Sequence, residues 1–264
     1  MIKIQKGEPP EELLTKGDKL KKALCDDFDK TPNDYLEGKK PFDIKGYGLE
    51  AVKTELKVRQ YNKCCFSEAK FTGEYPDIEH FRPKGRVDIY DTKEKLFPGY
   101  YWLAHEWSNL FYCKEVINTT YKRNFFPLYN EHERNRTHHD SFIEKSIFID
   151  PSIEDPRDFI RFERDEPKGF DKEGRGLFNI IVLGLRNTSF VDDRSDKFIA
   201  IQLSKSTVEI GLAEGISIDS DILAPHIKAL KEAMQPKAEF SSMAIDLLQD
   251  WPPLQLDLNL PESL

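Results

Sequence analysis

Residues 61–128 most strongly limit the folds open to this chain, because their pattern differs from that of the sequence on either side. This segment is rich in aromatic residues and interrupted by proline and glycine, with short strand-like runs and one helix start. The flanks have the apolar spacing of helices at residues 11–29 and 48–60, and again at 196–212, 219–234 and 241–251. We therefore expect an α+β protein with a small mixed centre between helical regions.

The chain divides into three expected regions. Residues 1–60 form an N-terminal helical region for support or docking, residues 61–130 the compact centre, and residues 131–264 a mainly helical C-terminal region. Within the last region, residues 147–151 and 159–162 have the composition of short strands and are expected to form a surface hairpin. The 264 residues are enough for one large domain or two modest ones.

The composition of the N-terminus and the use of cysteine indicate the cellular compartment. No apolar run is long enough for a transmembrane helix, and the first residues lack the apolar core of a signal peptide. The four cysteines are Cys25, Cys64, Cys65 and Cys113. Without a secretory signal they indicate reduced thiols, so we expect a cytoplasmic protein without membrane contact.

A carboxylate directly before a histidine, Glu79-His80, is the strongest chemical signal in the chain. The Glu79 carboxylate is a hard oxygen ligand that suits Mg²⁺ or Mn²⁺, and a histidine can accept a proton from water near neutral pH. Neighbouring strand residues point to opposite faces, so both side chains can serve one site only at a strand end. Pro83, three residues later, favours such an end.

Two asparagines supply the second half of the expected site. Asn109 follows Trp107 and is placed to hydrogen-bond the backbone near His80, which would hold the imidazole in orientation. Asn118 lies nine residues later, near the expected helix, and could give its amide oxygen to a metal ion. One such ion would bind a scissile phosphate and neutralise the leaving oxygen while the histidine activates water.

Basic residues near this site are candidates for phosphate contacts: Arg82, Lys84, Arg86, Lys122 and Arg123. The total formal charge is −8, which is unfavourable for binding a polyanion. Residues 60–128, however, contain ten Lys and Arg against nine Asp and Glu, so they carry +1 and the rest of the chain −9. The acidity therefore lies outside the expected site.

Three motifs give the chain a family resemblance. They are Glu-His-Phe-Arg-Pro-Lys, Tyr-Trp-Leu-Ala-x-x-Trp-x-Asn-Leu and Asn-x-x-Tyr-Lys-x-x-x-Phe-Pro-Leu. They resemble the PtuB-like HNH (ββα-metal) endonucleases of Septu and retron-linked anti-phage systems, and the similarity extends over most of the chain. The resemblance implies that Glu79 and Asn118 bind the metal, that His80 is the general base and that Asn109 supports it. It also implies bacterial defence and an ATPase partner of the ABC/SMC-like type.

The cysteines depart from the pattern of related nucleases, which place two Cys-x-x-Cys pairs around this core for a structural zinc. Here the first pair is reduced to Cys64-Cys-Phe-Ser67, and the second, Lys114-Glu-Val-Ile117, keeps no cysteine, with Cys113 offset by one position. Because a tetrahedral zinc site takes four ligands, we expect no structural zinc and only Mg²⁺ or Mn²⁺, one per active site. The departure puts the zinc in doubt and leaves the catalytic positions intact.

Other functions stay open at this stage. DNA is the favoured substrate, but RNA such as tRNA is an alternative, because a single-metal site can act on either phosphodiester. Loss of the zinc cysteines also leaves room for a catalytically silent scaffold subunit. The run His138-His139-Asp140 is interpreted as a solvated surface or a helix start, and His105, His132 and His226 receive no role. The aromatic residues of the centre are expected to be core: Tyr101, Trp102, Trp107, Phe111, Phe125 and Phe126.

Overall fold

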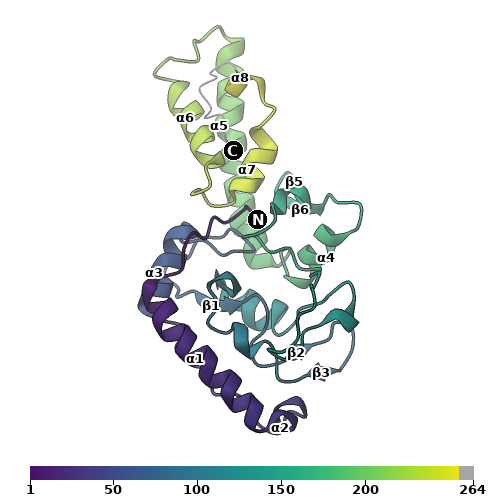
Figure 1. The fold of residues 1–264 in the computed structure, drawn as a ribbon. Helices are drawn as coiled ribbons and strands as arrows, with labels where there is room; N and C mark the ends of the chain where they lie inside the picture. The colour runs from purple at the N-terminus through teal and green to yellow at the C-terminus, as the bar shows by residue number, and fades with distance from the viewer. Residues whose placement is uncertain (256–264) are drawn as a thin grey trace.

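An antiparallel pair of short strands, β1 (Asp77–His80) and β4 (Leu110–Cys113), lies in the central part of the molecule (Figure 1). The structure, a computed structural model, describes residues 1–255. Glu79 pairs with Phe111 and His80 with Leu110, and all four residues of β4 are buried. The next element after β4 is η3 (Ile117–Lys122), a short stretch of π-helix. The apolar and aromatic residues of β4 are thus covered on both faces, whereas β1 is buried only at Glu79 and His80.

The other elements of the described residues are mostly helices, with two further pairs of short strands. The helices are α1 (Glu11–Lys30), α2 (Pro32–Leu36), α3 (Glu50–Arg59), α4 (Arg175–Val182), α5 (Thr188–Ala213), α6 (Ala224–Met234), α7 (Ser241–Leu248) and α8 (Pro252–Gln255). The other strands are β2 (Val87–Asp88), β3 (Lys95–Leu96), β5 (Ile160–Glu163) and β6 (Glu166–Gly169). Short helical turns are η1 (Tyr101–Leu103), η2 (Trp107–Asn109), η4 (Glu131–Glu133) and η5 (Pro156–Asp158). The α+β class predicted from the sequence is confirmed.

The helical regions lie at the two ends of the molecule. Helix α1 runs along one edge, and α5 to α8 form a helical lobe at the opposite end (Figure 1). Both predicted N-terminal helices are present, with ends within two residues of the expected ones. Among the described residues, no helix has the length and apolar character needed to cross a membrane. The last nine residues of the predicted C-terminal region, 256–264, lie outside the described residues.

The predicted surface hairpin is wrong in its first strand. Residues 147–150 form no strand, because side chains of α4 take the place of a partner strand. The Arg175 guanidinium donates to the carbonyl oxygens of Ile147 and Phe148, and the Asn179 side chain bonds Ile147 and Ile149. The predicted strand at 159–162 is present as β5, and it pairs with β6. Helix α4, which supplies these side chains, was not predicted.

The C-terminal helices are confirmed with shifted starts and ends. Helix α5 begins at Thr188, eight residues before the predicted start, and its first turns contain Arg194, a buried residue that does not look apolar in the sequence. The Arg194 guanidinium is satisfied by the carbonyl oxygens of Asp165 and Leu185. Helix α6 starts at Ala224 because Pro225 suits a first helical turn. Local apolar spacing thus located the helices but not their ends.

Candidate active site

Glu79 and His80 are the last two residues of β1, as their sequence context predicts. Their side chains are almost completely buried, with exposed fractions of 3% and 4%. The chain leaves the strand at Phe81, whose N–H donates to the carbonyl oxygen of Asn109. Glu79 and His80 thus stand at a strand end, where the chain leaves the regular alternation of side chains along the sheet.

The imidazole of His80 is held on both of its nitrogens. Nε2 lies 3.1 Å from the carbonyl oxygen of Ala104, and Nδ1 lies 3.3 Å from Nζ of Lys84. The Tyr47 ring contacts the imidazole edge-on at 4.6 Å between centroids. Burial lowers the pKa of His80 well below its ordinary value, and the nearby Lys84 ammonium lowers it further. The lowered pKa keeps the imidazole neutral near pH 7, and because a carbonyl oxygen only accepts hydrogen bonds, the proton is on Nε2 and the lone pair on Nδ1.

Asn109 holds two backbone segments near His80, one at Arg82 and one at Leu103. Its Oδ1 accepts from the backbone N–H of Arg82 over 2.7 Å, and its Nδ2 donates to the carbonyl oxygens of Arg82 and Leu103 at 3.0 and 3.1 Å. Leu103 precedes Ala104, whose carbonyl oxygen accepts from His80. The buried amide thus joins the segment after the histidine to the segment that orients its ring, in the position predicted for a supporting residue.

Side chains with oxygen atoms lie along β1 and in the neighbouring turn η3. Asn118 in η3 donates from Nδ2 to Oδ2 of Asp77 over 2.9 Å. Asp77 and Glu79 are two positions apart on β1, so they share one face. The sequence analysis missed Asp77, although the period of two in Asp-Ile-Glu could have signalled it. The structure therefore joins Asp77 to Asn118 directly, and Glu79 lies two positions along the same strand from Asp77.

The ammonium of Lys122 contacts Oε1 of Glu79 and also donates to the carbonyl oxygen of His80 over 3.1 Å. Lys122 is fully buried, so it is not part of a solvated basic face. Burial raises the pKa of Glu79, and Lys122 opposes this effect. Oε1 of Glu79 therefore faces a cation, the Lys122 ammonium. Carboxylate and amide oxygens such as those of Asp77, Glu79 and Asn118 are the kind of ligand that Mg²⁺ or Mn²⁺ prefers.

A groove of about 560 Å³ opens beside this cluster. Asp77 and Asn118 line it, together with Tyr47 and Lys84, the two residues that contact the imidazole of His80. Lys45 and Lys53 add positive charge to the wall. The groove therefore gives an elongated polar ligand access to the oxygen cluster, and His80 lies directly behind two of its lining side chains.

The other predicted phosphate-contacting residues differ in their surroundings. Arg82 pairs with Glu144 at 3.1 Å and Arg86 with Asp88 at 2.8 Å. Arg123 is exposed. Lys84 lines the groove, with Nζ 4.6 Å from the centroid of the Tyr47 ring. Lys84 is thus the basic residue that combines access to the groove with contact to His80.

Lys6 supports the site and was not predicted from the sequence. Its Nζ donates to the carbonyl oxygens of Trp107 and Leu110, the residues that flank the Ser108-Asn109 pair. Burial lowers the pKa of Lys6 to about 7. The sequence offers no signal for this role, because Lys6 lies about a hundred residues from the carbonyl groups that it binds. The aromatic residues predicted as core are buried or packed against the core, which confirms that interpretation.

Three of the cysteines gather in the core. The Sγ atoms of Cys64, Cys65 and Cys113 lie within 4.8 Å of one another, and those of Cys64 and Cys113 are 3.9 Å apart. Within the described part of the chain, no histidine or acidic side chain joins this group as a fourth ligand. The cluster thus lacks one ligand of a tetrahedral zinc site, and the absence of a structural zinc stays a prediction.

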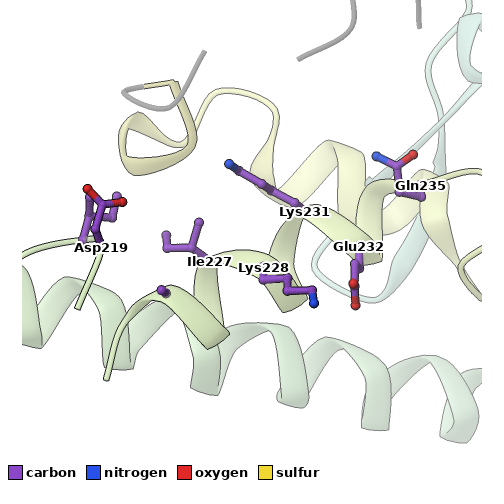
Figure 2. A pocket seen from close by; sticks show the side chains of 8 residues that line it. Asp219, Ile227, Lys228, Lys231, Glu232 and Gln235 are labelled. Carbon is purple, nitrogen blue, oxygen red and sulfur yellow. The ribbon is translucent and has the colours of Figure 1, made fainter. Parts of the chain in front are cut away.

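A second pocket, of about 370 Å³, lies on α6 in the C-terminal lobe. Figure 2 shows Lys228 and Lys231 extending from the helix in different directions, with Glu232 and Gln235 nearby. Its lining mixes charges of both signs and contains no histidine or cysteine. A buried histidine and several oxygen-bearing side chains occur near the end of β1, so we place the candidate active site there.

Comparison with known proteins gives one relative whose sequence identity is high enough to establish a common family. No family model and no solved structure matches the chain significantly. The Septu protein PtuB of Bacillus mycoides (strain KBAB4) is 31% identical over 217 residues, which cover 81% of this chain and 72% of the relative. The matched portion is longer than the β1–β4 centre and its adjoining turns, so it includes much of the flanking regions. On this similarity, the chain belongs to the Septu PtuB family.

Proposed function

We propose that this protein is a metal-dependent HNH-type endonuclease, a hydrolase that cleaves phosphodiester bonds of nucleic acid. The observation that carries the proposal is the buried imidazole of His80, whose Nε2 lies against the carbonyl oxygen of Ala104 and whose Nδ1 faces Lys84 and carries the lone pair. It stands at the end of a strand pair followed by a helical turn that contributes Asn118. This order of elements is what a ββα-metal core requires.

Each residue has a defined part in the proposed reaction. His80 accepts a proton from the attacking water at Nδ1, while Asn109 acts as a positioning residue through the backbone of Arg82 and Leu103. Glu79 and Asn118, with Asp77 beside them, would hold one Mg²⁺ or Mn²⁺. The bound ion supplies electrostatic stabilisation of the phosphate and of the leaving oxygen. Lys84 lies in the groove wall, where its ammonium can meet a phosphate.

DNA is the substrate that we propose first, and RNA such as tRNA remains the alternative. The exposed Arg123 would add a phosphate contact beside Lys84, whereas Arg82 and Arg86 are already paired with Glu144 and Asp88. So few contacts release few counterions, and the net charge outside residues 60–128 is −9. We therefore expect the isolated chain to bind duplex DNA with a Kd above roughly 1 μM at ~150 mM salt, because steering by charge is weak.

Membership of the Septu PtuB family supports a role in bacterial anti-phage defence. In that role we propose that an ABC/SMC-like ATPase brings the nucleic acid to the site. Helix α5 offers a surface for such a partner, because Ile199, Leu203 and Ile210 are each more than half exposed. At 100° per residue these three positions lie within about 40° of one another around the helix, so they form one apolar stripe.

A cleavage assay tests the proposal and separates it from a silent scaffold. Plasmid DNA and end-labelled duplex DNA, single-stranded DNA and tRNA are incubated in Mn²⁺ with the chain, alone and with its operon partner. We expect cleavage of DNA that His80→Ala lowers by about 10²- to 10⁴-fold. Circular dichroism of His80→Ala should match the wild type. Cleavage at the wild-type rate by His80→Ala would remove this histidine from the mechanism, and no cleavage of any substrate would favour the scaffold.

A further inference from the structure

Asp29, His138 and His139 form a second cluster of metal-ligating side chains, on the surface and separate from the residues at the end of β1. Each offers one ligand atom, and the three atoms lie within 4.8 Å of one another. Asp29 belongs to the last turn of α1, whereas the histidines lie in the loop after η4. We propose that this cluster is a binding site for a borderline divalent transition-metal ion such as Zn²⁺.

The separations between the ligand atoms match such an ion. Nε2 of His139 lies 2.8 Å from Oδ1 of Asp29, and Nε2 of His138 lies 3.5 Å from Oδ2 of the same carboxylate. Two ligands of a tetrahedral Zn²⁺ with bonds of 2.0–2.1 Å are about 3.3 Å apart. The observed distances lie on either side of this value, so small side-chain rotations are enough to seat the ion.

A tyrosine fixes the orientation of one ligand. The hydroxyl of Tyr101 lies 2.5 Å from Nδ1 of His138, which leaves Nε2 pointing at Asp29. The edge of the His138 ring also contacts Phe28, and its face lies against His139 with the ring centroids 3.9 Å apart. Hydrogen bonding of the second ring nitrogen to a buried group is the usual arrangement of a metal-bound histidine. The tyrosine is fully buried, so the ring is anchored to the core.

Asp140, the neighbour in sequence, is not part of the site, because it accepts from the backbone N–H groups of Arg136 and Thr137.

The ligand set also indicates which ions bind. Two imidazoles with one carboxylate suit Zn²⁺, Ni²⁺ or Fe²⁺ better than Mg²⁺, which prefers oxygen ligands. Three protein ligands leave a coordination position for water. His139 is 62% exposed at its side chain, so the ion exchanges with solvent and a chelator removes it. A bound ion would tie the end of α1 to the loop at residues 137–140.

Zinc titration of the full chain after dialysis against EDTA tests this site. We expect a Zn²⁺-binding event that raises the melting temperature, and an affinity at least about tenfold weaker in His138→Gln/His139→Gln and in Asp29→Asn. Tyr101→Phe keeps the ring in the core but loses the hydroxyl, so it should weaken Zn²⁺ binding without unfolding the chain. His132→Gln, an exposed histidine outside the cluster, is the matched control and should leave Zn²⁺ binding unchanged.

Two outcomes would overturn the proposal. One is unchanged Zn²⁺ affinity and stoichiometry in the double histidine variant, which would leave only a His–Asp ion pair on the surface. The other is a Co²⁺ complex with thiolate charge-transfer absorption that the double variant retains, which would place the ion at Cys64, Cys65 and Cys113. Neither readout depends on nuclease activity.

Discussion

Nε2 of His80 donates a hydrogen bond to the carbonyl oxygen of Ala104 over 3.1 Å, and this contact decides which nitrogen of the imidazole can act as a base. The proton is held on Nε2, so the lone pair is on Nδ1, next to Lys84 and the groove. Burial is the larger cause that lowers the pKa of His80, and the Lys84 ammonium is the next. The imidazole is therefore neutral near pH 7. The first two predictions follow from this geometry.

Lys84→Met should move the acidic limb of the pH–rate profile to higher pH. The Lys84 ammonium disfavours the protonated imidazole, so its removal raises the pKa of His80. A general base works in its neutral form, and activity would then be lost at a higher pH as the medium becomes more acidic. The measurement is kcat/KM against pH for cleavage in Mn²⁺. Lys93→Met, an exposed lysine of the β2–β3 turn, is the control, and an identical shift in both variants would contradict the assignment.

Asn109→Asp should lower kcat by about 10- to 100-fold with little change in KM, as loss of an orienting group does. The substitution keeps the shape and the acceptor that binds the N–H of Arg82. It removes the donor to the carbonyl oxygens of Arg82 and Leu103. Steady-state kinetics check the split between kcat and KM. Asn124→Asp, in a partly buried position outside this network, serves as control. A rise in KM alone would assign Asn109 to substrate binding.

Lys122→Met should destabilise the metal-free protein by as much as about 3–5 kcal/mol, because it leaves the Glu79 carboxylate buried without its cation. The same change should strengthen the response to Mn²⁺, since the ion no longer competes with the ammonium for Oε1. Thermal unfolding with and without Mn²⁺ measures both effects. The double variant Glu79→Gln/Lys122→Met should lose the added Mn²⁺ response. Equal Mn²⁺-induced shifts in wild type and Lys122→Met would show that Glu79 is not a ligand.

After dialysis against EDTA, the purified chain should contain no stoichiometric zinc and should remain folded. Among the described residues the three clustered thiols have no histidine or acidic fourth ligand, so we expect packing and not a metal to hold this part of the core. Elemental analysis and circular dichroism on one sample check both parts. About one zinc per chain that survives the chelator would mean that Cys64, Cys65 and Cys113 have recruited another ligand. An exposed site such as that at His139 would release its ion under these conditions.

Leu203→Glu should reduce copurification with the ATPase partner at least about tenfold, because it places a charge in the centre of the apolar stripe on α5. Folding should be unaffected, since the side chain is 65% exposed. Ile153→Glu, at an equally exposed isoleucine outside the lobe, is the matched control. Full recovery of the complex with Leu203→Glu would exclude this stripe as the docking surface.

Local patterns in the sequence located most of the long helices, though not α4, and the strand end that carries the candidate site. Apolar spacing located α1 and α3 nearly to the residue, and a strand that ends at Glu79-His80 followed from Pro83 and the aromatic surroundings. These features depend on residues within one or two turns of each other, so they can be read without knowledge of the fold. Helix ends were less certain where a buried polar residue, such as Arg194, interrupts the apolar pattern.

Only the tertiary structure decided which distant side chains meet. Asp77 reaches Asn118, and Lys122 lies buried against Glu79, because β1 and β4 pair across the intervening residues 81–109. Asp29 reaches His139 because α1 packs beside the segment that contains Tyr101. Such contacts depend on how the chain crosses itself, and neither spacing nor composition carries that information. Burial then turned Lys122, which looks like a surface cation in the sequence, into the internal partner of a carboxylate.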